Sequence, residues 1–285
     1  VVAGAGATIK MVNRALRMHG RTLSDVPLFS KITLGGAVAT QSHGTSRSHS
    51  FCDRVLAVYA VDDSLQPRWV HHDSAEFDRT CVTDVLLRIK CAVQHRTVLE
   101  GYESEGAAAD LDWQSWVDAD SGQAFVSGAG VWMEQYTRTN RGTHAPHLSN
   151  KWRAAIRDYL QCVCPCSVRR SVRSVADRMW LPRLWPIEES IAPMLRICNV
   201  ELFIVSELAS AAHLQRLATQ LVEYHARIGG RTNIRIHTRR SEITLVMLDL
   251  SVHGKNHLHT LLTLIRTQLK PQREWYHRGK YTALP

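Results

Sequence analysis

Hydrophobic residues recur at regular spacing in the first third of the chain. In residues 7–18 apolar side chains return every three to four positions, and Gly20 follows as a stop signal, so this segment predicts a short amphipathic helix. The segment Val55–Val61 is rich in β-branched residues and ends at a DDS turn, which predicts a strand. Residues 81–93 alternate enough to predict a half-buried strand. The first third is therefore expected to mix helix and strand.

The last third has a clearer pattern of alternating elements. Strands are predicted at residues 199–205, 233–238 and 242–251, the last two separated by the charged turn RRSE. Amphipathic helices are predicted at residues 209–230, which end in two glycines, and at residues 257–269. This order of elements predicts an α+β fold with an antiparallel sheet flanked by helices.

Between these parts the composition changes. Residues 102–130 are acidic and rich in small side chains, and we place a domain boundary near Glu100. Residues 151–186 are rich in Arg, Trp and Pro, and within them RRSVRSVADR (169–178) is expected to lie on a helix with its valines buried. We interpret its arginines as a solvated face rather than a nucleic-acid contact, because no recognisable reading module accompanies them.

One early segment consists mainly of small and polar residues. Residues 33–50 read TLGGAVATQSHGTSRSHS, and we expect them to form a loop. Gly35 and Gly36 would permit positive φ and close approach of a ligand to the backbone, with Ser46 and Ser48 as hydroxyl donors. The alternative is a tight glycine turn within a polar loop.

Composition sets broad limits on function. The chain has 285 residues, 45% of them hydrophobic, and a formal charge of +9, which favours anionic ligands or surfaces without identifying one. No apolar stretch approaches the roughly 20 residues of a spanning helix. The start, VVAGAGATIK, lacks an initiator Met and a secretory signal, and we interpret it as a fragment or a start within a domain.

Seven cysteines, an odd number, fit reduced thiols and an intracellular location, cytoplasmic or organellar, better than a disulfide framework. Cys162, Cys164 and Cys166 alternate with single residues, whereas structural zinc sites favour two intervening residues and require a fourth ligand. We therefore expect no metal site.

Two N-terminal stretches carry a family resemblance. VVAGAGATIKMVNRALRMHGRTL and ITLGGAVATQSHGTSRSHSFCDRVLAVYAVD together resemble the PCMH-type FAD-binding domain of the vanillyl-alcohol-oxidase superfamily, in its sugar-lactone and alditol oxidase branch. The similarity covers about the first sixty residues, including a segment of the form GGA-x-AT-x-x-HG-[ST]. It implies FAD as cofactor and a flavin-contacting set of Gly35, Gly36, Ala37, Thr40, Ser42, His43, Gly44 and Thr45.

The same resemblance extends to the C-terminal part. A VEF-type strand is matched by residues 200–203, and a terminal element with a His and a Lys is matched by His277 and Lys280. The resemblance implies that His277 contacts the cofactor. The family also has a Glu-x-Arg pair on a strand at the flavin face. Here Arg235 retains the Arg, whereas Asn233 stands in place of the Glu.

The chemistry implied by the resemblance is oxidation of a carbinol. A hydride leaves carbon for flavin N5, and a base or a cation must handle the proton on the oxygen. Arg235 and Lys280 would stabilise developing negative charge, although both are equally well interpreted as surface charges. Thr45 would lie near N5, and His43 is better interpreted as a loop support than as a reacting group.

Three departures from the family pattern bear on activity. The chain begins after the subdomain that supplies a phosphate-binding loop, it lacks an LG-x-LG segment before residues 82–93, and Asn233 removes a carboxylate. We expect a truncated FAD-binding domain at residues 1–100 and a substrate or cap domain at residues 101–285.

The expected function is oxidation of a sugar 1,4-lactone or a polyol by FAD, with oxygen or another acceptor, as in ascorbate-type lactone pathways. Some relatives associate peripherally with membranes, and no specific nucleic-acid partner is expected. The alternatives are a degenerate relative without activity and, from another class, a basic module that binds polyanions.

Overall fold

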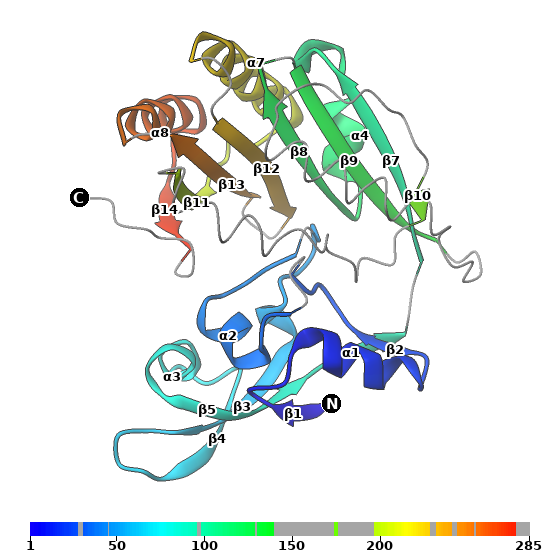
Figure 1. The fold of residues 1–285 in the computed structure, drawn as a ribbon, viewed down its shortest axis with the longest axis vertical. Helices are drawn as coiled ribbons and strands as arrows, with labels where there is room; N and C mark the ends of the chain where they lie inside the picture. Colours follow the sequence, from blue (N-terminus) through cyan, green and yellow to red (C-terminus); the bar gives the residue numbers. More distant parts are fainter. Residues whose placement is uncertain are drawn as a thin grey trace. The chain divides into compact units, whose positions relative to one another are not determined.

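Two units make up the fold. The computed structural model describes residues 1–27, 31–44, 46–95, 98–128, 130–139, 174–175, 197–228, 232–240, 244–253 and 255–277. The first unit is formed by residues 1–97 and the second by the described residues from Val98 onward. Both mix helices with antiparallel strands, so the predicted α+β class is confirmed (Figure 1).

The first unit has ten short elements. In chain order they are β1 (Val2–Gly4), α1 (Ile9–Arg17), β2 (Arg21–Leu23), α2 (Leu34–Ala39), a 3-10 turn (Cys52–Arg54), β3 (Val55–Val61), β4 (Pro67–His71), α3 (Phe77–Thr83), β5 (Val85–Cys91) and β6 (Val93–His95). The strands form a four-stranded sheet in the order β1-β5-β3-β4 and a small β2-β6 sheet. All of these pairings are antiparallel.

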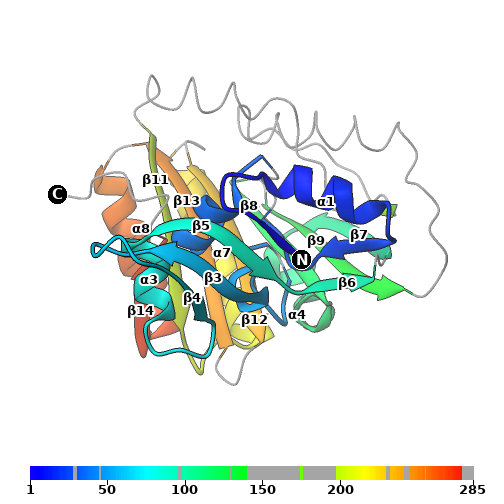
Figure 2. The ribbon, with the colours of Figure 1, turned by 90° about the horizontal axis from the view of Figure 1, so that it is seen from below.

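Three helices cover one face of the four-stranded sheet. Ile9 of α1, Leu34 of α2 and Phe77 of α3 are buried in one cluster with Val58 of β3 and Ile89 of β5. The opposite face of the sheet carries no helix in this unit (Figure 2). All the large hydrophobic side chains that are exposed among the described residues belong to this unit. The exposed apolar side chains of the described residues are thus concentrated in the first unit.

A buried amide ties α1 to its neighbouring strand. Asn13 is fully buried, and its Oδ1 accepts hydrogen bonds from the backbone N–H of Leu23 (2.7 Å) and from the Thr22 hydroxyl (3.0 Å). At the N-terminus of the helix, the Thr8 Oγ1 accepts from the N–H of Met11 (3.2 Å) as an N-cap. These bonds fix both the start of α1 and its packing on β2.

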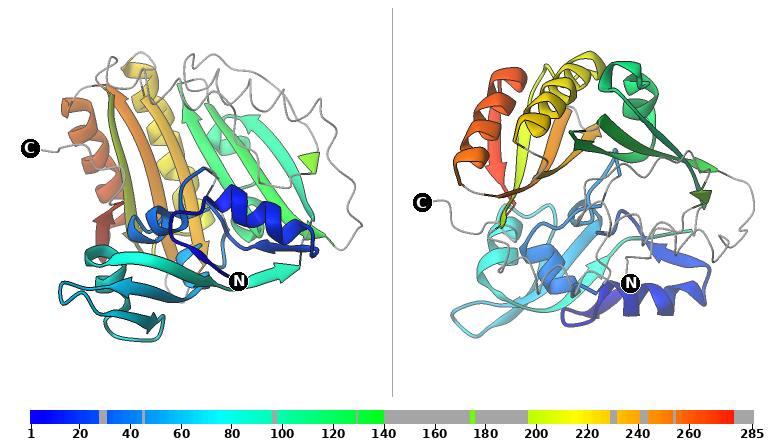
Figure 3. Two further views of the ribbon diagram at one scale, coloured as in Figure 1. Left: turned by 60° about the horizontal axis from the view of Figure 1, so that its bottom comes forward. Right: turned by 45° about the horizontal axis from the view of Figure 1, so that its top comes forward.

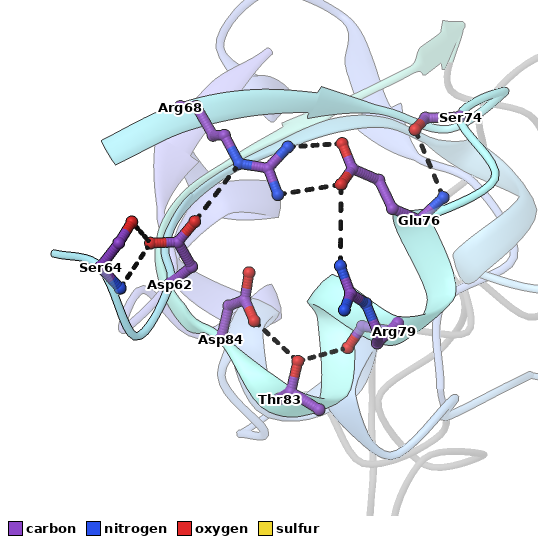
Figure 4. A network of polar contacts seen from close by, with 8 residues as sticks. All are labelled: Asp62, Ser64, Arg68, Ser74, Glu76, Arg79, Thr83 and Asp84. Carbon is purple, nitrogen blue, oxygen red and sulfur yellow. Dashed lines mark hydrogen bonds and ion pairs between the residues drawn. The ribbon is translucent and has the colours of Figure 1, made fainter. Parts of the chain in front are cut away.

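A network of polar contacts fixes β4 to the start of α3 (Figure 4). Arg68 donates two hydrogen bonds to the Glu76 carboxylate, at 2.5 and 2.9 Å, and lies 3.8 Å from Asp62. The hydrogen bond from Arg68 lowers the pKa of Glu76, and the Ser64 hydroxyl, which donates to Asp62, lowers the pKa of that carboxyl. The network lies at the surface and sets local geometry more than total stability.

The network also explains where one strand prediction is wrong. The alternation in residues 81–93 predicted strand throughout, but Cys81 to Thr83 form the last turn of α3 and strand begins only at Val85. Thr83 donates to the carbonyl oxygen of Arg79 (3.0 Å) and to Asp84 (2.7 Å), so the helix closes one residue before the strand. Buried Phe77 and Cys81, four residues apart, favour the helix.

The second unit contains one large sheet and three α-helices among its described residues. Its elements are β7 (Val98–Gly106), a 3-10 turn (Ala108–Asp110), α4 (Trp113–Asp118), β8 (Ser121–Ser127), β9 (Gly130–Thr139), β10 (Ser174–Val175), β11 (Ile197–Val205), α7 (Ala211–Arg227), β12 (Thr232–Arg240), β13 (Thr244–His253), α8 (Lys255–Leu269) and β14 (Arg273–Tyr276). The eight strands run in the order β10-β7-β9-β8-β12-β13-β11-β14, and every neighbouring pair is antiparallel.

The helices α4, α7 and α8 cover one face of this sheet (Figure 3). Trp116 of α4, Leu217 of α7 and Leu261 of α8 are fully buried against Ile236 of β12 and Leu248 of β13. Because strand side chains alternate between faces, the odd-numbered residues of β11, β12 and β13 lie on the other, helix-free face. That face carries the charged residues described below.

The elements predicted in the last third are confirmed as β11, β12, β13, α7 and α8, and those predicted at residues 7–18 and 55–61 as α1 and β3. The helix predicted for residues 169–178 is wrong at Ser174 and Val175, which form β10. They pair with Gly101 and Glu100 on the edge of β7, whose backbone groups accept a further strand. The remainder of that segment and the Cys162–Cys166 cluster lie outside the described residues.

Some chemical possibilities can be assessed for the described part of the chain. There, no helix combines the length and apolarity of a membrane span, and no cluster of three His, Cys, Asp or Glu side chains is arranged to hold a metal. Cys52, Cys81 and Cys91 are free thiols. Burial raises the pKa of Cys81 to about 12 and that of Cys91 to about 11, which makes both poor nucleophiles.

Candidate cofactor site and substrate face

The glycine pair of residues 33–50 lies in a helix rather than in an open loop. Gly35, Gly36 and Ala37 belong to α2, and the Thr33 Oγ1 caps this helix by accepting from the N–H of Gly36 (3.0 Å). The expectation of positive φ at the pair is wrong, since Gly20 and Gly130 are the glycines with positive φ among the described residues. Leu34 and Val38 are buried four residues apart, and this packing favours the helix.

Gly35 is needed for contact between two backbone segments. Its N–H donates to the carbonyl oxygen of Ala5 (2.8 Å), and the N–H of Leu34 donates to that of Ala7 (2.9 Å). A Cβ at position 35 would lie 3.2 Å from the Ala5 Cβ, tighter than ordinary contact. The AGAGAT and TLGGA stretches, far apart in sequence, are thus bonded into one structure.

A left-handed residue turns the chain sharply after α2. Gln41 has φ +55°, its N–H donates to the carbonyl oxygen of Val38 (3.0 Å), and the N–H of Ser42 donates to that of Ala37 (2.8 Å). This is a Schellman ending, in which glycine is the usual left-handed residue. The turn brings the hydroxyls of Thr40 and Ser42 into a hydrogen bond of 2.8 Å.

The His-Gly pair that follows packs against an earlier loop. The His43 Nδ1 lies 2.8 Å from the Gly44 carbonyl oxygen, so the ring is held by its own backbone. A Cβ on Gly44 would lie 2.5 Å from the carbonyl oxygen of Val26 and 3.2 Å from that of Asp25. Only glycine fits here without movement of the backbone. Thr45 lies outside the described residues.

The first unit also has open glycine backbone near its N-terminus. A Cβ added at Gly4 or at Gly6 would meet nothing within 4 Å, and both residues are exposed. The flanking side chains are alanines, and Gly35 bonds this stretch to α2. Exposed glycine backbone allows close approach of a large planar or phosphorylated ligand, so the residues present fit a flavin nucleotide.

In the second unit, charged and aromatic residues lie on the helix-free sheet face. Arg235 of β12 and Glu201 of β11 share one backbone register partner on β13, Asp249. The guanidinium of Arg235 lies 5.1 Å from the centre of the Phe125 ring, which packs on Trp132 at 4.8 Å. The face therefore combines a cation, an acid and an aromatic platform.

His277 lies directly beyond the end of β14 and next to Glu201. Its N–H donates to the Glu201 carbonyl oxygen (2.9 Å), and its Nε2 lies 4.0 Å from the Glu201 Oε2. Both side chains are buried, with 6% and 2% of their surfaces exposed. Asn233 precedes Arg235 by two residues on β12. Lys280 lies outside the described residues.

The structure therefore groups the predicted site residues by unit. Gly35, Gly36, Ala37, Thr40, Ser42, His43 and Gly44 gather around α2 in the first unit. Asn233, Arg235 and His277 belong to one sheet in the second unit. Sequence reasoning missed Glu201 and the buried Gln123–Glu134 pair, in which Gln123 donates to Glu134 at 2.9 Å. An acid inside the apolar strand VELFIV was the available signal.

Comparisons with known proteins bear on the cofactor and the fold. Residues 1–64 match the sequence family described as FAD binding domain. The expected cofactor, FAD, is confirmed. No curated protein matches the sequence.

Among solved structures, the chain is similar to a solvent-stable cholesterol oxidase, with TM-score 0.63 and 14% identity, over 96% of this chain and 69% of that one. It is also similar to cholesterol oxidase from B. sterolicum, with TM-score 0.61 and 12% identity, over the same shares of the two chains. At these identities the similarity shows the fold. Neither description names a lactone.

Proposed function

We propose that the protein is an FAD-dependent oxidoreductase that oxidises a hydroxyl-bearing carbon of a sugar 1,4-lactone or a related polyol. The observation that carries this proposal is the placement of Arg235 and Glu201 on the helix-free face of the second unit, with His277 beside Glu201. In the lactone and alditol oxidases that the sequence resembles, a strand with a Glu-x-Arg pair contributes to the flavin face, and Arg235 retains the Arg of that pair.

In the proposed enzyme the first unit holds the flavin nucleotide. The exposed backbone at Gly4 and Gly6 would lie against it, and the hydroxyls of Thr40 and Ser42 would hydrogen-bond to it. FAD supplies the hydride acceptor when bound. His43, hydrogen-bonded to its own backbone, would keep the shape of this wall.

The substrate class follows from what lines the face. Gln123, Glu134, Glu201, His237 and His277 are all buried there. These groups already have partners within the protein, such as the Gln123–Glu134 hydrogen bond and the Glu201–His277 pair, so they give the face a polar character. Cholesterol, the substrate type named for the similar solved structures, carries a single hydroxyl, whereas a polyhydroxylated lactone offers several hydrogen-bonding groups to a polar face. Phe125 with Trp132 offers an aromatic surface for a sugar ring.

Individual roles follow from the chemistry of the side chains. Arg235 remains cationic at any working pH and would stabilise negative charge on the substrate oxygen as hydride leaves. Asn233 has no carboxylate to take a proton, so we assign it a hydrogen bond to a substrate hydroxyl. Lys280 would share the role of Arg235.

The test is anaerobic reduction of the bound flavin. The protein is loaded with FAD, desalted, and mixed with an aldono-1,4-lactone, an open-chain alditol or cholesterol while the visible flavin absorption is followed. We expect bleaching by the lactone or the alditol and none by cholesterol. A folded protein that stays colourless after loading, or one bleached by cholesterol alone, would overturn the proposal.

Two arginines of β12 provide a matched comparison. Arg235→Met should slow bleaching by about 10²–10³-fold, the usual effect of removing one group that stabilises a developing oxyanion. Arg239→Met removes the same charge from the same strand and face, four residues away, and should change the rate only a few-fold. Equal effects of the two variants would show that Arg235 has no specific role.

A further inference from the structure

The geometry points to Glu201 as a positioning residue that keeps His277 in its cationic, protonated form. This inference rests on the proposed function for its catalytic meaning, but the pairing itself involves only described residues of the second unit. His277 was assigned to the cofactor by resemblance alone, and no role was assigned to Glu201.

The first step of the argument is the burial of Glu201. Its side chain is 2% exposed and lies on the helix-free face of β11, between β13 and β14. A carboxylate removed from water needs a nearby positive charge or strong hydrogen bonds, since the cost of burying it alone amounts to several kcal/mol. The His277 Nε2, 4.0 Å away, is too far for a hydrogen bond but close enough for charge attraction.

The second step is the fixed position of His277. The near-parallel rings of Trp275 and Phe203 have centroids 5.4 Å apart, and the His277 ring stacks on Phe203 at a centroid distance of 6.0 Å. The hydrogen bond from the His277 N–H to the Glu201 carbonyl oxygen continues the β11–β14 ladder. The imidazole is thus held near the carboxylate by the backbone of its strand and by its contact with Phe203.

The opposite face of β14 is fastened separately. Arg266 of α8 donates to both oxygens of Glu274, at 2.6–3.0 Å, and to the Tyr276 hydroxyl at 3.1 Å. Removing the Glu201 charge should therefore leave the strand in place. The variant then reports on the charge of His277 rather than on its location.

Other charges near the pair have defined places. Asp249 is the backbone register partner of Glu201 on β13. On β14, the Arg273 guanidinium lies 5.2 Å from the centre of the Trp275 ring. Glu274 forms an ion pair with Arg266 on the helix-covered face of the sheet. Glu201 is thus the acid in contact with the imidazole, and the cation so maintained would favour negative charge on a nearby ligand.

The test measures the His277 pKa directly in the protein without substrate. Imidazole NMR signals are followed against pH, and the His277 signal is identified by its loss in His277→Gln. We expect the wild-type pKa to lie above the ordinary value of about 6.5 and to fall by about one unit or more in Glu201→Gln. Glu223→Gln, which removes an exposed acid from α7, should leave it unchanged.

Each outcome has a defined meaning. A wild-type pKa at or below the ordinary value, or equal shifts in Glu201→Gln and Glu223→Gln, would overturn the inference. If Glu201→Gln does not fold, Glu201→Asp, which retains the charge, should keep the raised pKa, and the wild-type value alone remains decisive. If the His277 pKa is raised but the protein fails to oxidise lactones, the Glu201–His277 pair is supported and the proposed function is rejected. With activity present, the alkaline limb of the flavin-reduction profile should move to lower pH in Glu201→Gln.

Discussion

Replacing Gly44 by alanine is the sharpest test of how the cofactor segment is built. The added Cβ would lie 2.5 Å from the Val26 carbonyl oxygen, a distance at which the backbone must move. That oxygen belongs to a loop in which Asp25 has φ +56° and accepts from the Arg54 guanidinium at 3.5 Å. Because these contacts oppose movement of the loop, we expect Gly44→Ala to lower the free energy of unfolding of the first unit. The decrease should lie near the upper end of the 1–3 kcal/mol that is typical of overpacking.

Gly6→Ala is the matched control for this change. It adds the same methyl group within the same FAD-binding segment, but the new Cβ meets nothing within 4 Å. The free energy of unfolding of the first unit in this variant should stay within about 0.5 kcal/mol of the wild-type value. The contrast between the two variants isolates the steric term from any general effect of replacing glycine.

The measurement has to report on the first unit alone, because a chain of two units does not unfold in a single transition. Amide hydrogen exchange of peptides from β1, α2 and β3 gives the opening free energy of that unit. For about 100 residues, each kcal/mol corresponds to roughly 4–8 °C in Tm, so Gly44→Ala should lower Tm by about 10 °C or more. Exchange in Gly44→Ala equal to that in Gly6→Ala would refute the packing argument.

Three further predictions concern single sites in the first unit. Gln41→Gly should stabilise it by about 1 kcal/mol, because glycine adopts φ +55° without strain, and a decrease in stability would contradict the Schellman assignment. Glu76→Gln should destabilise it at neutral pH, because it removes the carboxylate whose pKa is lowered in the folded protein. The difference in stability between the variant and wild type should vanish as acid protonates Glu76. A difference in stability that does not depend on pH would argue against the ion pair with Arg68. Iodoacetamide should label Cys81 and Cys91 far more slowly in the folded protein than after denaturation, by about a thousandfold for Cys81, and mass spectrometry of the labelled peptides would reveal any fast native reaction.

Long periodic segments were predictable from the sequence because a hydrophobic pattern that repeats over many residues rarely arises by chance. The helix α7 and the strands β12 and β13 were found with bounds close to those observed. The helix α2 was missed because its six residues include two glycines, and its stability comes from the Thr33 cap and from burial, which only the fold supplies.

The candidate site was partly predictable for a related reason. The glycine-rich segment could be recognised from its residue types at fixed spacing. Arg235 and His277 could be singled out from their match to the family pattern. The contact between Glu201 and His277 could not be predicted from the sequence, because it depends on the pairing of β14 with β11. The alternation of hydrophobic and polar residues in a strand does not tell which other strand it pairs with.

The order of strands in the large sheet has a consequence for biosynthesis. The strand β11 is paired on one side by β13 and on the other by β14, both of which follow it in the chain. During synthesis on the ribosome, β11 therefore emerges before both of its partners, and the backbone groups on both of its edges remain unpaired. Unpaired strand edges can pair with other chains and so promote aggregation. Emergence of β14 (Arg273–Tyr276) from the ribosome, rather than of any earlier segment, should mark the point at which this unit becomes resistant to aggregation.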